Sequence, residues 1–179
     1  VRVGITGDVF MAPVGTALPT NIATALNAAF KPVGHISEDA VTESYSVTTE
    51  KIKSWQSKAG VRTVITEFEW TFQFVALETS PLIFDLYYGD VTGTTATGIT
   101  TTVIPNDPVP LQKACVVEIT DGTVIRRYAF SKVEVSDRGE VNHSGGEGTG
   151  YDLTISVLGG VSSLGSIITN DPAFAALSS

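Results

Sequence analysis

Apolar and polar residues alternate without a break from residue 67 to residue 74, inside the segment 61–77. Four aromatic positions interleave with four polar ones: Phe68, Trp70, Phe72 and Phe74 against Glu67, Glu69, Thr71 and Gln73. Because successive side chains of a β-strand point to opposite faces, this period of two predicts a long strand with an aromatic face toward the core. The polar face is then left for water or for a partner.

A second alternating segment, 40–47, predicts another strand. Its two faces carry Val41, Glu43, Tyr45 and Val47 on one side and Thr42, Ser44, Ser46 and Thr48 on the other. Further strands are predicted over 7–12, 33–37, 113–120, 123–136 and 151–158. Since the chain is also rich in Thr, Val and Ile, which favour strands, we expect a mainly β fold.

The Asp121-Gly122 link between two of these strands predicts a β-hairpin. An Asp-Gly pair favours a two-residue type I′ turn, because both central residues of that turn need positive φ. One short helix is predicted at about residues 80–89, where Thr79 or Ser80 can cap and the next residue, a proline, suits the first helical position. The segment 20–30 is open to two interpretations, a helix or a loop.

Two segments are hard to place in a lone domain with a core over about 5–160 of the 179 residues. The segment 47–60, an extended inter-strand loop, sets Trp55 among three lysines, and the tail 160–179 is mostly apolar. Either both fold back on their own domain, or they are arms that dock on neighbouring subunits. On the second interpretation the contact residues are Lys51, Lys53, Trp55 and Phe174.

The formal net charge of −8 argues against a protein that reads DNA or RNA sequence, because such proteins present a basic surface, and no cluster of Lys and Arg stands out. No apolar run approaches the roughly 18–20 residues that a membrane span needs. We therefore expect a soluble protein, assembled in a cytoplasm and without membrane insertion.

Catalytic and metal-binding patterns are sparse. His35 and His143 are the only histidines and lie far apart, and Cys115, the only cysteine, sits in a segment typical of a buried strand, so no zinc site is predicted. The Gly-rich stretch 143–150 lacks the GK[ST] ending of a phosphate-binding loop and is better explained as a turn.

Carboxylates are scattered, and the pair Glu67 and Glu69 lies on the face opposite the aromatic residues. A general-acid pair needs a cleft, which that open face does not supply. We expect no catalytic residue, no metal site and no cofactor. The chain is predicted to be a structural protein rather than an enzyme.

Eight short segments then occur in a specific order along residues 15–158: GTALPT (15–20), NAAF (27–30), VGHISEDAVTES (33–44), IKSWQ (52–56), TFQF (71–74), YYGD (87–90), RGEV (138–141) and GYDLTISVL (150–158). In this order they resemble the major tail tube proteins of siphophages, particularly those that infect actinobacteria. The fold of that family is similar to the tube subunits of type VI secretion systems and of contractile tails. The tail beyond residue 159 lies outside the resemblance.

The resemblance implies a β-sandwich with a flanking helix, whose copies close into hexameric rings with one continuous inner β-barrel. Stacked rings would form the tail tube of a virion, the conduit through which DNA leaves the capsid. The implied partners are other copies of the chain and the tape-measure, tail-terminator and tail-tip proteins. DNA would be a passing, non-specific cargo.

If strands 40–48, 61–77, 113–120 and 123–136 form that inner barrel, their polar faces predict its lining. The predicted lumen residues are Ser44, Ser46, Glu67, Glu69, Thr71, Gln73, Glu118 and Glu134. Arg126 and Lys132 fall on the same parity, but carboxylates dominate. Such a lining offers DNA phosphates few lasting partners, because affinity for a polyanion comes largely from cationic side chains.

Two other classes of protein stay open at this point. One is a different phage structural part, such as a capsid decoration or head–tail connector protein. The other is an immunoglobulin-like adhesin or a carbohydrate-binding module, which predicts a stable monomer with an aromatic patch for stacking on sugars.

Overall fold

The computed structural model describes residues 2–55, 57–107, 109–141, 143, 148–160 and 163–178, and it confirms a mainly β fold with one short helix. The strands are β1 (Thr6–Pro13), β2 (Lys31–Pro32), β3 (Ile36–Ser54), β4 (Ser57–Ala76), β5 (Thr92–Ala96), β6 (Ile99–Val103), β7 (Gln112–Asp121), β8 (Val124–Arg138), β9 (Tyr151–Val157) and β10 (Ser166–Thr169). Every strand pair that the structure describes is antiparallel.

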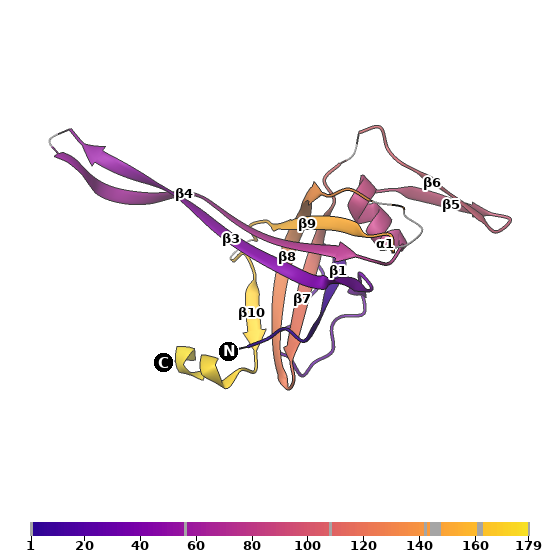
Figure 1. Cartoon of the computed structure of the whole chain (residues 1–179), viewed down its shortest axis with the longest axis horizontal. Coiled ribbons are helices and arrows are strands. Elements are labelled where there is room, and N and C mark those ends of the chain that lie inside the picture. Colours follow the sequence, from indigo (N-terminus) through magenta and orange to yellow (C-terminus); the bar gives the residue numbers. More distant parts are fainter. Residues whose placement is uncertain are drawn as a thin grey trace.

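Eight strands form one sheet in the order β2-β1-β7-β8-β9-β4-β3, and β10 pairs with β8 outside this path. The strand β8 belongs to both halves of the sheet, because its first part pairs with β10 and its last part with β9. In Figure 1, β9, β4 and β3 cross over β7 and β8, so the sheet curls back on itself. The strands β5 and β6 form a separate hairpin, which projects on the side of the molecule opposite the outer ends of β3 and β4.

A β-bulge in β8 sets the face of each of its side chains. Lys113 pairs with Val133 and Cys115 with Phe130, so two steps on β7 match three on β8. Phe130 and Val133 therefore both face the main core despite their odd spacing. The expectation that Arg126 shares the parity of Glu134 is wrong, since the bulge reverses the alternation between them.

The main core fills the inside of the curled sheet. Its buried side chains come from β1, β4, β7, β8, β9 and the helix, and the largest are Met11, Phe72, Phe74, Ile83, Leu86, Phe130, Leu153 and Ile155. A smaller cluster lies on the other face of β1, β7 and β8: Ala12, Phe30, Ala114, Val116 and Ala129. Partly buried side chains of the segment 14–30, including Leu18 and Leu26, cover this second cluster.

The predicted helix is confirmed. The Oγ of Ser80 accepts a hydrogen bond from the N–H of Ile83, the helix α1 spans Pro81–Phe84, and it continues as the π-helical turn η1 (Asp85–Gly89). The sequence pattern did not predict the π-helical turn. Ile83 and Leu86 are buried in the main core, so the helix closes one end of the curled sheet.

The segment 20–30 is a loop, so the helical interpretation is wrong. The N–H of Thr24 donates to Asn21 Oδ1 at 2.7 Å, and the N–H of Ala29 donates to Asn27 Oδ1 at 3.0 Å. The Nη1 of Arg127 binds the carbonyl oxygen of Asn21 at 2.9 Å. These side chains take the backbone groups that a helix would pair internally.

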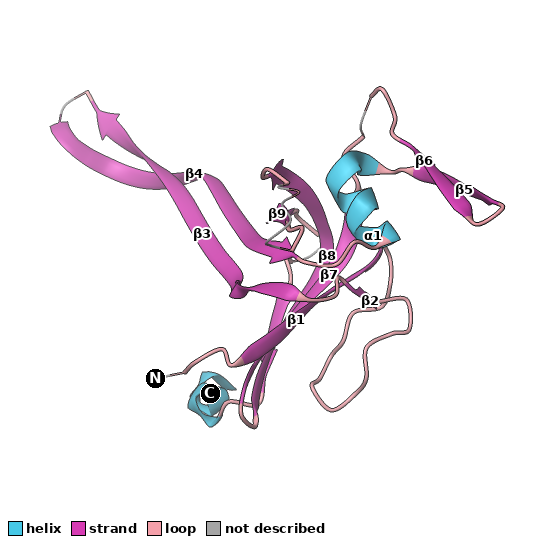
Figure 2. Ribbon diagram, turned by 45° about the vertical axis from the view of Figure 1, so that its right-hand side comes forward, coloured by secondary structure: helices cyan, strands magenta, loops and turns pink. Residues whose placement is uncertain are grey.

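The segment 47–60 is not a loop, contrary to the sequence-based expectation. Backbone pairing of β3 with β4 continues from Val47↔Phe68 outward to Ser54↔Ser57, so the two strands form one long hairpin. Register shifts at Thr48/Thr49 and Ile52/Lys53 interrupt the alternation, and this hides the strands in the sequence. We call residues 45–68 the arm, because Figures 1 and 2 show them leaving the rest of the molecule as a two-stranded ribbon.

The hairpin of β7 and β8 is confirmed, but its turn differs from the predicted one. Asp121 pairs with Val124, so the turn residues are Gly122 and Thr123. Of these only Gly122 has positive φ, at 62°. That pattern does not fit type I′, which needs positive φ at both positions.

The tail lies against its own sheet as far as the structure describes it. The strand β10 pairs with β8 from Ser166↔Ala129 to Thr169↔Arg126, and the 3-10 helix η2 (Pro172–Ser178) follows. Gly165 allows this approach, since a Cβ at that position would lie 2.4 Å from Phe130 Cδ1. Contact of the tail with another subunit stays a prediction.

Candidate assembly interfaces

The polar face of the arm and its sheet is continuous across β3, β4, β9 and the end of β8. Ser44 pairs with Thr71 and Ser46 with Glu69, and across the next two strand pairs Thr71 meets Ser156, which meets Glu134. Directly opposed residues of neighbouring strands share a face. The structure thus brings these predicted lumen residues together: Ser44, Ser46, Glu67, Glu69, Thr71, Gln73 and Glu134.

Strand β9 adds polar residues that the sequence reasoning did not select. Asp152, Thr154 and Ser156 lie on the same face, and Gln73 Nε2 donates to Asp152 Oδ1 at 3.0 Å. The alternation in YDLTISVL predicts this face, because the polar residues alternate with Tyr151, Leu153 and Ile155, which are all buried.

Glu118 is separated from the other predicted lumen residues. Its Oε2 accepts from Arg127 Nε at 2.7 Å and lies 2.6 Å from Nη2. The Arg127 side chain is 7% exposed and also holds the loop at Asn21. This carboxylate therefore anchors the segment 14–30 to the sheet, and it faces a buried cation rather than open water.

The predicted contact residues fall into two places. Lys51, Lys53 and Trp55 lie together at the end of the arm, and Trp55 is fully exposed, at 101% of its reference area. Phe174 lies apart from them on η2, with the Arg126 Cζ 5.6 Å from its ring centroid.

The arm carries an apolar stripe that none of the described residues covers. Its most exposed members are Tyr45 at 58%, Val47 at 40%, Ile65 at 63% and Phe68 at 45%. The stripe continues the face that holds Phe72 in the core. Trp70 sits at the boundary, where its Nε1 donates to Glu43 Oε1 at 2.9 Å.

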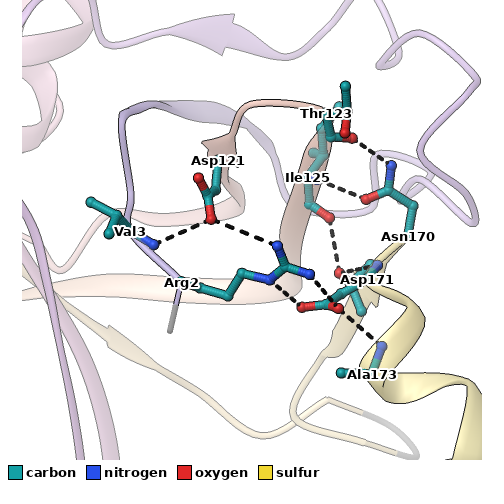
Figure 3. A network of polar contacts seen from close by, with 9 residues as sticks. Arg2, Val3, Asp121, Thr123, Ile125, Asn170, Asp171 and Ala173 are labelled. Carbon is teal, nitrogen blue, oxygen red and sulfur yellow. Dashed lines mark hydrogen bonds and ion pairs between the residues drawn. The ribbon is translucent and has the colours of Figure 1, made fainter.

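A polar clasp joins the N-terminal segment to the tail (Figure 3). Arg2 Nε and Nη2 donate to the two carboxylate oxygens of Asp171 at 2.9 and 2.8 Å. The N–H of Ala173 also donates to Asp171 Oδ1. These hydrogen bonds, that from Arg2 above all, lower the pKa of the Asp171 carboxyl from 3.8 to about 2. The partners are 169 residues apart in sequence, so no local pattern predicts the pair.

The cysteine and the two histidines that were considered for catalysis or metal binding do not form a common site among the described residues. Cys115 is buried in β7, and burial raises the pKa of its thiol well above the ordinary value, which keeps it protonated. His35 is exposed beside Glu78, while His143 Nδ1 lies 3.4 Å from Thr149 Oγ1. Within the described residues, no three His, Cys, Asp or Glu side chains are grouped to hold a metal ion.

The structure does not test the interpretation of the Gly-rich stretch 143–150 as a turn, because its residues 144–147 lie outside the described part of the chain. Among the helices that the structure describes, none has the length and apolar character to cross a membrane.

A family model described as phage tail tube protein matches residues 1–177, and this match confirms the resemblance to tail tube proteins. A search of curated proteins found no match.

Proposed function

The chain belongs to the phage tail tube protein family, and we propose that its copies close into hexameric rings that stack into a conduit for DNA. The family makes it a structural component of the virion tail. The observation that carries the proposal is the continuous polar face over β3, β4, β9 and β8, backed by the aromatic core. A tube needs this two-faced sheet, with water on one side and a packed core on the other.

The free edge of β3 supports ring closure. In the described sheet β3 is the terminal strand, is 19 residues long and pairs only with β4. A long unpaired edge is a hazard for aggregation unless another chain covers it. Joining the edges of neighbouring copies around a ring removes the hazard, since a heterologous contact that closes on itself leaves no edge free.

The lining of the tube would be hydroxyl, amide and carboxylate. Glu67, Glu69 and Glu134 lie on the polar face with Ser44, Ser46, Thr71 and Gln73. We assign this face to the lumen, where DNA passes without lasting contacts because cationic groups are scarce there. Tape-measure, tail-terminator and tail-tip proteins are the further partners of this assembly, which forms in the host cytoplasm.

The arm supplies contacts between copies. Trp55 is fully exposed at its end and is flanked by Lys51 and Lys53. Burial of about 200 Å² of indole surface contributes up to roughly 5 kcal/mol before the costs of ordering are subtracted. An exposed aromatic residue at the outer end of the arm is therefore a contact for a neighbouring copy rather than a part of the monomer core.

Negative-stain microscopy of the purified chain tests the proposal, with rings or tubes as the expected particles. Trp55→Ala should raise the protein concentration needed for assembly at least tenfold and leave the circular dichroism spectrum and melting temperature unchanged. Trp55→Phe is the matched control and should assemble nearly as the parent does. A parent chain that stays monomeric at all concentrations contradicts the tube, and normal tubes of Trp55→Ala contradict the role of the arm.

A further inference from the structure

A groove lies at the open end of the curled sheet, between the N-terminal segment, the start of β3 and the exposed ends of β7 and β8. Its volume is about 940 Å³, within the range of pockets that hold small ligands, and it is therefore large enough for an indole ring. Apolar side chains line it, among them Ile5, Val41 and Ile119. The groove thus offers an apolar surface outside the main core.

Carboxylates dominate the charged lining of this groove. Asp8, Glu38, Glu43, Glu78 and Asp121 contribute to it, against two arginines. Glu43 is held by Trp70 Nε1 and by the hydroxyl of Tyr128. Glu38 is exposed and has no hydrogen-bond partner among the residues that the structure describes, so its charge is free to meet a partner.

The arm tip has the opposite character. Four of the 11 Lys and Arg residues of the chain fall between residues 51 and 62, and the only carboxylate near them is Glu50. The side chains of Lys51 and Lys53 are exposed on either side of Ile52, with Trp55 beyond them. An acidic chain thus carries a local excess of positive charge on a projecting, aromatic tip.

We propose that this groove is the receptor for the arm tip of a second copy of the chain. The inference rests on the proposed function, and it names the surface on which the arm docks. Trp55 meets the apolar lining and the lysines meet Glu38 and Glu78, so the two surfaces are complementary in charge and in apolar character. The arm of the same copy does not fill the groove, because its tip stands apart from every other element in both views of the molecule.

A charge-reversal experiment on the full chain tests the pairing. The arm variant is Lys51→Glu/Lys53→Glu, and the groove variant is Glu38→Lys/Glu78→Lys. Each alone should raise the concentration needed for assembly at least tenfold, because like charges then meet at the contact. The single variant Glu38→Lys removes no hydrogen bond within the described structure and should act in the same direction.

Mixing the two variants is the decisive step. In the mixture an acidic arm meets a basic groove and a basic arm meets an acidic groove, so alternating copies should assemble although neither variant does so alone. The same recovery is expected when all four substitutions are placed on one chain. The matched control, Asp107→Lys/Glu140→Lys, changes the net charge as much as the groove variant does and should neither block assembly nor rescue the arm variant.

The outcomes separate the two proposals. Normal assembly of Glu38→Lys and of the groove variant, together with a blocked arm variant, leaves arm docking intact and assigns the groove to another occupant, which overturns this inference. Failure of the mixture to assemble, with both variants folded by circular dichroism, overturns it as well. Absence of assembly by the parent chain contradicts the proposed function itself.

Discussion

The strands β3 and β4 run through two environments that differ although their sequence pattern is the same. Near the end of β4, Phe72 and Phe74 are 0% and 1% exposed within the core. A few residues earlier on the same face, Phe68 is 45% and Ile65 is 63% exposed on the arm. The alternation of apolar and polar residues continues across this boundary as far as Glu67, whereas the covering elements stop.

The difference between the core end of β4 and the arm shows that periodicity predicts a strand and its two faces but not which residues cover those faces. In the core the covering comes from β1, β7 and α1 of the same chain. On the arm nothing in the described chain replaces them, so we expect the apolar stripe to be covered by another copy in the assembly that we propose. An exposed stripe of this kind is a usual mark of an interface.

The largest effect is expected from truncation of the buried end of this face. Phe72→Ala should lower the free energy of unfolding by about 3–5 kcal/mol, because it opens a cavity among Trp70, Tyr128 and Phe130. Phe68→Ala is the matched control and should cost less than about 1 kcal/mol in the monomer while it impairs assembly. Chemical denaturation of both variants measures the difference. Equal losses would show that the arm is part of the monomer core.

A smaller, local effect is expected from loss of the clasp between Arg2 and Asp171. Asp171→Asn removes the charge that holds Arg2, so the tail should detach while the core stays folded. Hydrogen exchange of the amides in β10 measures this, with Asp107→Asn as the matched control. Protection of β10 equal to that of the parent would contradict the clasp.

The same clasp should respond to pH in a defined direction. The pKa of the Asp171 carboxyl is lowered in the folded state, so its stabilising effect is fully present above its ordinary pKa of 3.8 and is lost as the pH falls through about 2. In the parent chain, exchange of the β10 amides should therefore rise over this interval. In Asp171→Asn it should lack that transition.

The smallest effect on stability is expected on the polar face. Glu67→Lys/Glu69→Lys should change the free energy of unfolding by no more than about 0.5 kcal/mol, since both side chains are exposed. Tubes should still form, but DNA passage should slow, most at low salt, where attraction to phosphates is least screened. Ejection rates from particles that contain the variant measure this, with Glu67→Gln/Glu69→Gln as the control. An unchanged rate would place these glutamates outside the lumen.

Local patterns predicted most of the strands and the helix because each depends on neighbours in sequence. Ser80 and Pro81 define the start of α1, and the alternation around Phe72 defines β4. The segment 20–30 was ambiguous because its structure depends on Arg127, which lies about a hundred residues away and binds the backbone at Asn21. Helix propensity depends only on residues nearby in sequence, so it does not predict such a contact.

The candidate interfaces show the same division. Alternation correctly predicted the residues of the polar face, with the exception of Glu118. This residue has the right parity, but its ion pair with Arg127 and the segment 14–30 that covers it are tertiary features, which alternation does not predict. The outer part of the arm, residues 47–60, was predicted to be a loop because three register shifts interrupt its period. The groove that Glu38 lines combines segments that lie far apart within the first 130 residues, so no local spacing in the sequence predicts it.

The bulge between Phe130 and Val133 has a consequence for how this chain tolerates insertions and deletions. Removing one residue there, for example Ser131, deletes no core side chain and leaves two steps between Phe130 and Val133, which match the two steps between Lys113 and Cys115 on β7. Phe130 and Val133 would still both face the core, because positions two apart on a regular strand share a face. A loss of two residues would instead turn Val133 and Val135 to the polar face and Glu134 toward the core, because a shift of one residue exchanges the faces of a strand. The loss of two residues at this point should therefore be far more damaging than the loss of one.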